Sequence, residues 1–157
     1  MHANIQLITL FYSAFQKRDG KAMAACYHPE VEFSDPVFQN LKGERAKAMW
    51  IMLCERAKDL SIEFSKVSAD DKTGGAHWDA WYLFSATGRT VHNVIDARFE
   101  FKDGLIIKHT DTFDLHRWAG QALGLGGKLL GGTAFMQNKI RRTANAGLDA
   151  FMKKAGT

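Results

Sequence analysis

The second half of the sequence consists of turn-delimited segments in which apolar and polar residues alternate, and this period of two predicts β-strands. The expected strands run over residues 60–69, 77–86, 91–102 and 105–116. Helical patterns precede them, one ending near residue 19, a short one stopped by His28-Pro29, and one over residues 43–57. Helices followed by a meander of strands predict an α+β fold, in which a curved antiparallel sheet wraps around the helices.

A length of 157 residues with 46% hydrophobic content suits one domain. We expect residues 1–124 to form it. Residues 125–157 are expected to add an irregular glycine-rich linker and a C-terminal amphipathic helix, packed on the same domain. The apolar stripe of that helix is Met136, Ile140, Ala144, Leu148 and Phe151. A role at a membrane surface is the alternative for this helix, but its basic face is small, so packing is favoured.

The formal charge of +4 is spread along the chain, and no basic run is interleaved with stacking aromatics, so no nucleic-acid partner is expected.

Cys26 and Cys54 each lie in an apolar helical pattern. We interpret both as small hydrophobic residues of a protein in the reducing cytoplasm. No signal-peptide pattern or bilayer-length apolar run is present, and a cytoplasmic protein is predicted. His77, His92 and His109 do not share a face, so no metal site is expected, and no other cofactor is predicted.

The strand that follows the Asp103-Gly104 turn carries polar residues where the core should be. Alternation puts His109 and Asp111 on the inner face together with Ile107 and Phe113. Because an unpaired buried charge costs several kcal/mol, His109 and Asp111 are expected to satisfy each other and a partner, or to line a pocket.

The preceding hairpin predicts the rest of that pocket. A two-residue turn at Thr87-Gly88 sets Tyr82 opposite Asn93 and Trp78 opposite Ala97. The inner wall then combines aromatic side chains with a few polar groups, as small-molecule sites do. Its members are Trp78, Tyr82, Asn93, His109 and Asp111.

The outer face of the same hairpin has a different character. The same turn places Asp79 opposite Asp96, with His77, Arg98 and Trp81 beside them. A charged network next to a tryptophan predicts a subunit contact, and we expect a homodimer through this face.

The segments "EVEFSDPVF", "LKGERAKAM" and "DGLIIKHTDTFDL", after a helix with an inward tyrosine, resemble the SnoaL-like branch of the nuclear transport factor 2-like superfamily, which includes ketosteroid isomerase, polyketide cyclases and limonene epoxide hydrolase. The resemblance covers about residues 5–124. It implies a cone-shaped α+β barrel with a deep apolar pocket, usually dimeric through the outer sheet face. It specifies the fold better than the reaction, because this scaffold hosts both enzymes and binders.

By this resemblance, Tyr12 corresponds to the hydrogen-bonding tyrosine of the isomerase and Asp35 to its general base. The third functional group of the isomerase is a protonated aspartic acid. Its counterpart here is Asp96 if residues are counted back from the turn, or Ala97 if the strands are aligned by their apolar faces. We prefer the face, because a one-residue slip would expose Phe99 and Phe101. Whether Asp96 faces the pocket or a subunit interface is left open.

The sequence therefore predicts a cofactor-free pocket enzyme that acts on a small apolar carbonyl or epoxide compound by general acid/base chemistry, such as isomerisation, cyclisation or epoxide or lactone opening. Asp35 or Asp111 would move the proton, while Tyr12 and Asn93 or His109 would stabilise charge on oxygen. Trp78, Tyr82 and Phe113 would form the wall. The alternative is a non-catalytic domain that binds a hydrophobic ligand.

Overall fold

The computed structural model describes residues 2–156 and confirms the α+β fold. The first half contains α1 (Ala3–Gln16), α2 (Gly20–Ala25), β1 (Tyr27–Ser34), β2 (Leu41–Lys42) and α3 (Glu44–Arg56). The strand region contains β3 (Ser61–Ala69), β4 (Thr73–Phe84), β5 (Arg89–Lys102) and β6 (Leu105–Thr112). The chain ends with α4 (Leu115–Leu123), α5 (Leu125–Leu130) and α6 (Ala134–Ala155).

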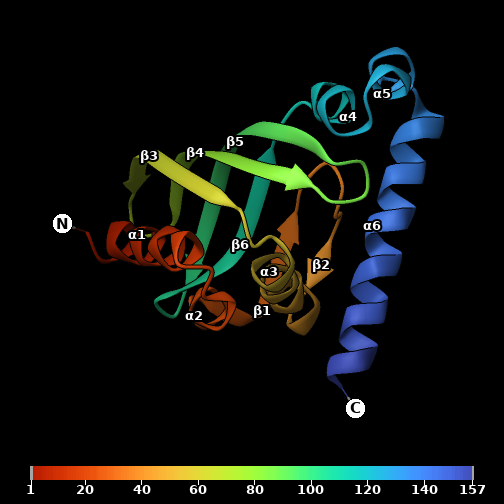
Figure 1. Ribbon diagram of the computed structural model, residues 1–157. Coiled ribbons are helices and arrows are strands. Elements are labelled where there is room, and N and C mark those ends of the chain that lie inside the picture. Colours follow the sequence, from red (N-terminus) through yellow and green to blue (C-terminus); the bar gives the residue numbers. More distant parts are fainter. Residues whose placement is uncertain (1, 157) are drawn as a thin grey trace.

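The strands form one curved sheet in the order β2-β1-β6-β5-β4-β3, which stays open because β2 and β3 are its edges. Neighbouring strands are antiparallel except for β1 and β6, which run parallel. Helices α1, α2 and α3 lie on the inner side of the curve, and α6 runs along the open end beside α3 (Figure 1). The core therefore lies between the sheet and these helices.

Helix α1 buries the apolar stripe that its sequence predicts. Ile8, Tyr12 and Phe15 recur at helical spacing and are at most 2% exposed. Asp19 caps the following helix, because its carboxylate accepts a hydrogen bond from the backbone N–H of Ala22. These packing and capping interactions fix the helices against the inner face of the sheet.

The second helix ends earlier than its apolar pattern predicts. It stops at Ala25, and Tyr27 and His28 already belong to β1. Tyr27, Val31 and Phe33 are all buried, but Pro29 between them is exposed and the pairing of β1 with β6 shifts between Tyr27 and Glu32, so the alternation is interrupted there. His28 and Pro29 therefore lie within a strand and do not simply end a helix.

The hairpin of β4 and β5 has a longer loop than predicted. Phe84 pairs with Arg89, so four residues form the connection and the register moves by two positions. Trp78 consequently lies opposite Ile95, and Ala80 lies opposite Asn93. A register shift of two residues leaves every side chain on its predicted face, whereas a shift of one residue would have moved the side chains of a strand to the opposite face.

A β-bulge changes one residue of the predicted inner face of β6. Glu100 pairs with Lys108 and Phe101 pairs with Ile106, which leaves Ile107 as the extra residue. Ile106 is therefore fully buried, while the predicted inner residue Ile107 is only half-buried. Beyond the bulge the alternation is as expected.

The C-terminal region is more regular than its glycine content suggests. The segment predicted as an irregular linker from residue 125 begins with helix α5, directly after α4. Helix α6 follows, with Leu148 fully buried. Arg45 of α3 binds Asp149 and Asn145, and the Arg141 side chain donates to the Pro36 carbonyl at 2.9 Å. Among residues 2–156, no helix is long and apolar enough to cross a membrane.

Candidate active-site cavity

A cavity of about 580 Å³ lies between α3, α6 and the inner face of the sheet. Most of its wall is apolar, with contributions from α3 such as Met49, Trp50 and Leu53. Six of the residues predicted for the site line it together, namely Asp35, Trp78, Tyr82, Asn93, Asp111 and Phe113. Two carboxylates therefore meet one largely apolar space.

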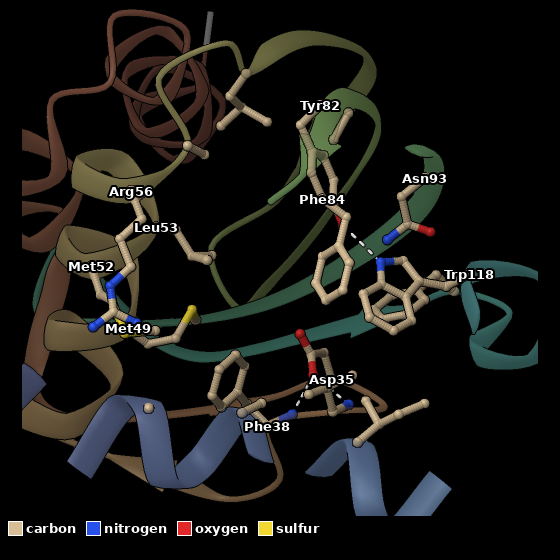
Figure 2. Close-up of a pocket in the computed structure, with 18 of the residues that line it drawn as sticks. Asp35, Phe38, Met49, Met52, Leu53, Arg56, Tyr82, Phe84, Asn93 and Trp118 are labelled. Atoms are coloured by element: carbon tan, nitrogen blue, oxygen red, sulfur yellow. Dashed lines mark hydrogen bonds between the residues drawn. The ribbon is translucent and has the colours of Figure 1, made fainter. Parts of the chain in front are cut away.

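Asp35 enters this space from the turn that follows β1. Pro36 has no N–H to continue the strand ladder, and Asp35 Oδ1 accepts hydrogen bonds from the backbone N–H groups of Val37 and Phe38, at 2.7 and 2.6 Å. Figure 2 shows the carboxylate pointing into the cavity, with Tyr82, Phe84 and Trp118 on the opposite side. The turn thus presents a carboxylate to the apolar walls.

Burial raises the pKa of Asp35 from 3.8 to about 7. This value is the net result of burial, which is the largest cause, of the backbone N–H groups of Phe38 and Val37, which lower the pKa, and of the negative charge of Asp111, which raises it. A carboxyl group with a pKa near 7 exchanges its proton at neutral pH. It can therefore serve either as a general acid or as a general base.

Asp111 projects from β6 and is held by a chain of buried hydrogen bonds. Its Oδ1 lies 2.8 Å from His109 Nε2, and His109 Nδ1 lies 2.7 Å from the Tyr27 hydroxyl. The Trp50 indole N–H donates to that hydroxyl at 2.8 Å. Because this oxygen already accepts from Trp50, its own hydrogen is free for Nδ1, and Nε2–H donates to Asp111. This assignment satisfies every group with a neutral imidazole.

His109 acts on the cavity only through Asp111, because it is completely buried and is not part of the cavity wall. Aromatic rings enclose it, with Phe99 at 4.4 Å, Phe33 at 4.9 Å and the stacked Trp50 at 5.9 Å between ring centroids. Both ring nitrogens have partners, which removes the cost of burying them unpaired. His109 therefore holds Asp111 by a hydrogen bond from behind the cavity wall.

A family model described as a SnoaL-like domain matches residues 8–109, about two thirds of the chain. The chain belongs to the SnoaL-like family. No curated protein matches it.

Solved structures confirm the SnoaL-like, NTF2-like fold. A protein from Jannaschia named as a SnoaL-like polyketide cyclase has a TM-score of 0.67 at 14% identity, with 76% of this chain and 91% of that one covered. An LEH-like epoxide hydrolase from M. tuberculosis has a TM-score of 0.62 at 19% identity, covering 82% and 96%. An NTF2-like protein of unknown function from Burkholderia pseudomallei has a TM-score of 0.62 at 16% identity, covering 73% and 92%.

The SnoaL-like match ends at His109, so part of the cavity wall lies beyond it. Asp111, Phe113 and Trp118 follow the matched segment, as does the whole of α6. Helix α6 contributes apolar positions of its predicted stripe to the wall, Met136, Ile140 and Ala144. One carboxylate and one side of this cavity are therefore specified by residues outside the family match.

Tyr12, the counterpart of the isomerase tyrosine by the sequence resemblance, does not line this cavity. Its ring packs in the core against Phe64, Trp78 and Phe99. Burial raises its pKa well above the usual value, and its hydroxyl has no hydrogen-bond partner among residues 2–156. Tyr12 is therefore not part of the cavity wall, although it lies close enough to Asp111 for the charge of that carboxylate to contribute to its raised pKa.

Asp96 lies on the outer face, which resolves the alternative that the sequence left open. Its carboxylate accepts from His77 Nδ1 at 2.9 Å and is exposed, while Ala97 is 3% exposed on the inner side. His77 also reaches Asp79, and Asp79 reaches His92 at 2.7 Å. No group of three or more His, Cys, Asp or Glu within residues 2–156 is arranged to hold a metal ion.

The structure reveals hydrogen-bond donors that the sequence did not assign, and also the relay of buried hydrogen bonds from Trp50 through Tyr27 to His109. The Trp78 indole nitrogen is buried at the cavity wall without a partner among the described residues, and Trp118 donates to the Tyr82 hydroxyl at 2.7 Å. The Tyr82 hydrogen is thereby directed away from Trp118. The sequence carries no continuous signal for Tyr27 in this relay, because the alternation from Phe33 back to Tyr27 is interrupted at the exposed Pro29.

Proposed function

We propose that this SnoaL-like protein is an enzyme that performs general acid/base chemistry on a small apolar carbonyl or epoxide compound, by isomerisation, cyclisation or ring opening. The observation that carries the proposal is the meeting of Asp35 and Asp111 in one apolar cavity. Two carboxyl groups in different environments can hold different protonation states, which is what acid/base catalysis requires.

In this proposal Asp35 carries the transferred proton. Its pKa of about 7 allows it to remove a proton next to a carbonyl group, or to protonate an opening epoxide oxygen, at neutral pH. Asp111 is the second carboxylate, oriented by His109 at 2.8 Å. It would hold a substrate hydroxyl or a water molecule on the other side of the reacting atoms.

Negative charge that develops on a substrate oxygen needs hydrogen-bond donors. Tyr82 and Asn93 supply O–H and N–H groups at the wall, and Tyr82 is positioned by Trp118. Donors fixed in an apolar, water-poor site stabilise such charge more strongly than water does. The surrounding apolar walls suit a substrate with few polar groups.

A non-catalytic binding domain is the second candidate, favoured by the preponderance of apolar side chains in the cavity wall and by the absence of Tyr12 from that wall. The two candidates differ in what the carboxylates do. An enzyme needs an ionisable group at positions 35 and 111, whereas a binder needs only shape and hydrogen bonding.

A turnover screen with small ketones, lactones and epoxides, combined with ligand-binding measurements, tests the proposal. Asp35→Asn and Asp111→Asn keep the side-chain shape and remove the ionisable group. We expect turnover to be abolished while ligand affinity stays within about tenfold, or 1.4 kcal/mol. Asp103→Asn is the matched control, because Asp103 lies in an exposed turn with a positive φ that asparagine also tolerates.

The binding-domain candidate replaces the enzyme if the parent protein converts no compound of the screen and both amide variants bind ligand as the parent does. Native mass spectrometry of the purified protein provides the starting ligand for this comparison, since an apolar molecule held in the cavity would co-purify with it.

A further inference from the structure

A cluster of exposed apolar side chains lies on α5 and at the start of α6. Leu125, Leu129 and Phe135 are each 70% or 71% exposed, and Leu130 is 49% exposed. Leu125 and Leu129 are one helical turn apart and therefore share a face of α5. Elsewhere in residues 2–156, only Leu10 and Leu83 are large apolar residues with comparable exposure. We call these four residues the α5 apolar surface.

The chain around this surface carries the positive charge of the protein. Residues 115–148 contain no aspartate or glutamate, but they include Arg117, Lys128, Lys139, Arg141 and Arg142. Because the whole chain has a formal charge of +4, the remainder is close to neutral. Arg117 and Lys128 also line a shallow depression of about 530 Å³ next to α5, together with Arg89 and one acidic residue, Asp114. Apolar and basic groups thus share one end of the molecule.

The shape of the molecule places this surface where it can touch a flat partner. Helix α5 forms a corner that projects away from the sheet, between α4 and the beginning of α6 (Figure 1). Its leucines do not contribute to the cavity wall, so no part of the acid/base site accounts for them. Exposed apolar side chains grouped in this way mark interaction surfaces in soluble proteins.

We propose that the α5 apolar surface and its surrounding basic residues dock the protein on an anionic lipid bilayer. The leucines and Phe135 enter the boundary between headgroups and acyl chains, and the basic side chains approach lipid phosphates. A second copy of the chain fits this surface less well, because a symmetric contact would oppose two surfaces on which Asp114 is outnumbered by Arg89, Arg117 and Lys128. Nucleic acid would leave the leucines uncovered.

Docking in this orientation also brings the cavity close to the bilayer. Met136 and Ile140 of α6 line the cavity, and α6 begins only one residue before Phe135. An apolar ligand that partitions into lipid would then have a short path to the cavity. This consequence rests on the proposed function, but docking itself does not, so the two can fail separately.

Flotation of the full chain with lipid vesicles tests docking. We compare phosphatidylcholine vesicles with vesicles that contain about one third phosphatidylglycerol, and expect at least tenfold stronger binding to the anionic ones, weakened by salt. The combined substitutions Leu125→Ser, Leu129→Ser and Phe135→Ser should lower binding at least tenfold. Leu10→Ser is the matched control, because Leu10 is 57% exposed on α1.

A second pair of variants tests the charge contribution without altering the apolar residues. Arg117→Gln with Lys128→Gln should weaken anionic-vesicle binding, whereas Lys17→Gln with Lys21→Gln, exposed at the other end of the fold, should not. All variants should keep the thermal midpoint of the parent, since every changed side chain is exposed.

Docking is contradicted if the parent binds neither kind of vesicle, or if the triple serine variant binds like the parent. It is also contradicted if the parent is an oligomer that the triple variant separates while vesicle binding is absent, because the surface is then a contact between protein copies.

Discussion

The two faces of the sheet each carry a histidine–aspartate cluster, and the clusters differ in environment more than in geometry. On the inner face, His109 and Asp111 are 2.8 Å apart, with side chains that are 0% and 2% exposed. On the outer face, His77 lies 2.9 Å from both Asp79 and Asp96, with its side chain 25% exposed. The same type of His–Asp hydrogen bond is therefore made once in the buried interior and once at the solvent-exposed surface.

The difference teaches which cluster can support chemistry. Water screens the outer cluster, so its ion pairs contribute at most about 1 kcal/mol each to stability. The inner cluster is surrounded by aromatic rings, and a charge there costs several kcal/mol unless it is partnered. Asp35 lies in the same buried interior, and its burial, together with the charge of Asp111, raises its pKa to about 7. The inner face is thus where a proton can be moved at neutral pH.

The largest expected difference between the faces is in turnover. Asp35→Asn or Asp111→Asn should reduce the rate on an identified substrate by about a thousandfold, the typical contribution of a general acid or base. Asp79→Asn and Asp96→Asn should leave the rate within about twofold, because both residues lie on the outer face. Steady-state kinetics measures all four variants, and equal losses on the two faces would remove the distinction.

The next largest difference concerns stability. His109→Ala should destabilise the protein by about 3 kcal/mol, because it leaves an empty space in the core and removes the hydrogen bonds of His109 to Asp111 and Tyr27. His77→Ala should cost less than about 1 kcal/mol, since water replaces its exposed contacts. Urea unfolding gives both values. An equal cost for the two substitutions would mean that the buried relay is not held as described.

A smaller effect should appear in the pH dependence of stability. The pKa of Asp35 is about 7 in the fold and near 3.8 when unfolded, so the unfolded chain releases this proton first as the pH rises. The stability contribution of Asp35 is therefore complete below pH 3.8 and lost as the pH rises to 7. Asp35→Asn removes this loss and should stabilise the protein at pH 8 by on the order of 2 kcal/mol, with no gain near pH 3.8.

On the outer face, pH should act in a milder way. Its hydrogen bond to Asp96 raises the pKa of His77, with a further contribution from Asp79. The stabilisation from His77 is then present below pH 6.5 and fades as the pH rises above that value. Thermal midpoints measured across this range should show a shallow decline in the parent that His77→Ala lacks, whereas parallel curves would contradict it.

The smallest predicted effect concerns association. We expect the outer face to form a homodimer, because His77, Asp79, Asp96 and Arg98 lie there beside Trp81, whose ring stacks on His92 at 4.5 Å. Arg98→Glu should weaken the dimer about tenfold by like-charge repulsion. Sedimentation velocity at micromolar concentration measures it. A monomeric parent protein would contradict the dimer, and would leave the inner-face account intact.

Alternation along the strands was sufficient to predict the inner face, because a period of two survives errors in turn length. The β4–β5 register was wrong by two residues, yet Trp78, Asn93 and Asp111 still reached the cavity. The bulge at Ile107 could not be predicted, since nothing in an apolar run shows which residue is extra. Strand faces are thus predicted more securely than strand pairings.

Features that depend on contacts between distant elements were harder to predict. The Trp50–Tyr27–His109 relay joins α3, β1 and β6, and no local pattern links these residues. Tyr12 is absent from the cavity wall although Phe15 of the same helix lines it, and helical periodicity does not distinguish these two inward positions. Glycine content suggested an irregular segment after residue 120, but α4 and α5 form there, with Gly127 packed against the Ala119 carbonyl.

The most direct test of the acid/base account is a titration of the Asp35 carboxyl carbon by NMR, in the parent protein and in Asp111→Asn. The account predicts an inflection near pH 7 for Asp35, because burial raises its pKa, and a lower inflection in the variant, because the charge of Asp111 also raises it. An Asp35 inflection at the ordinary value near 3.8 in both proteins would contradict the account.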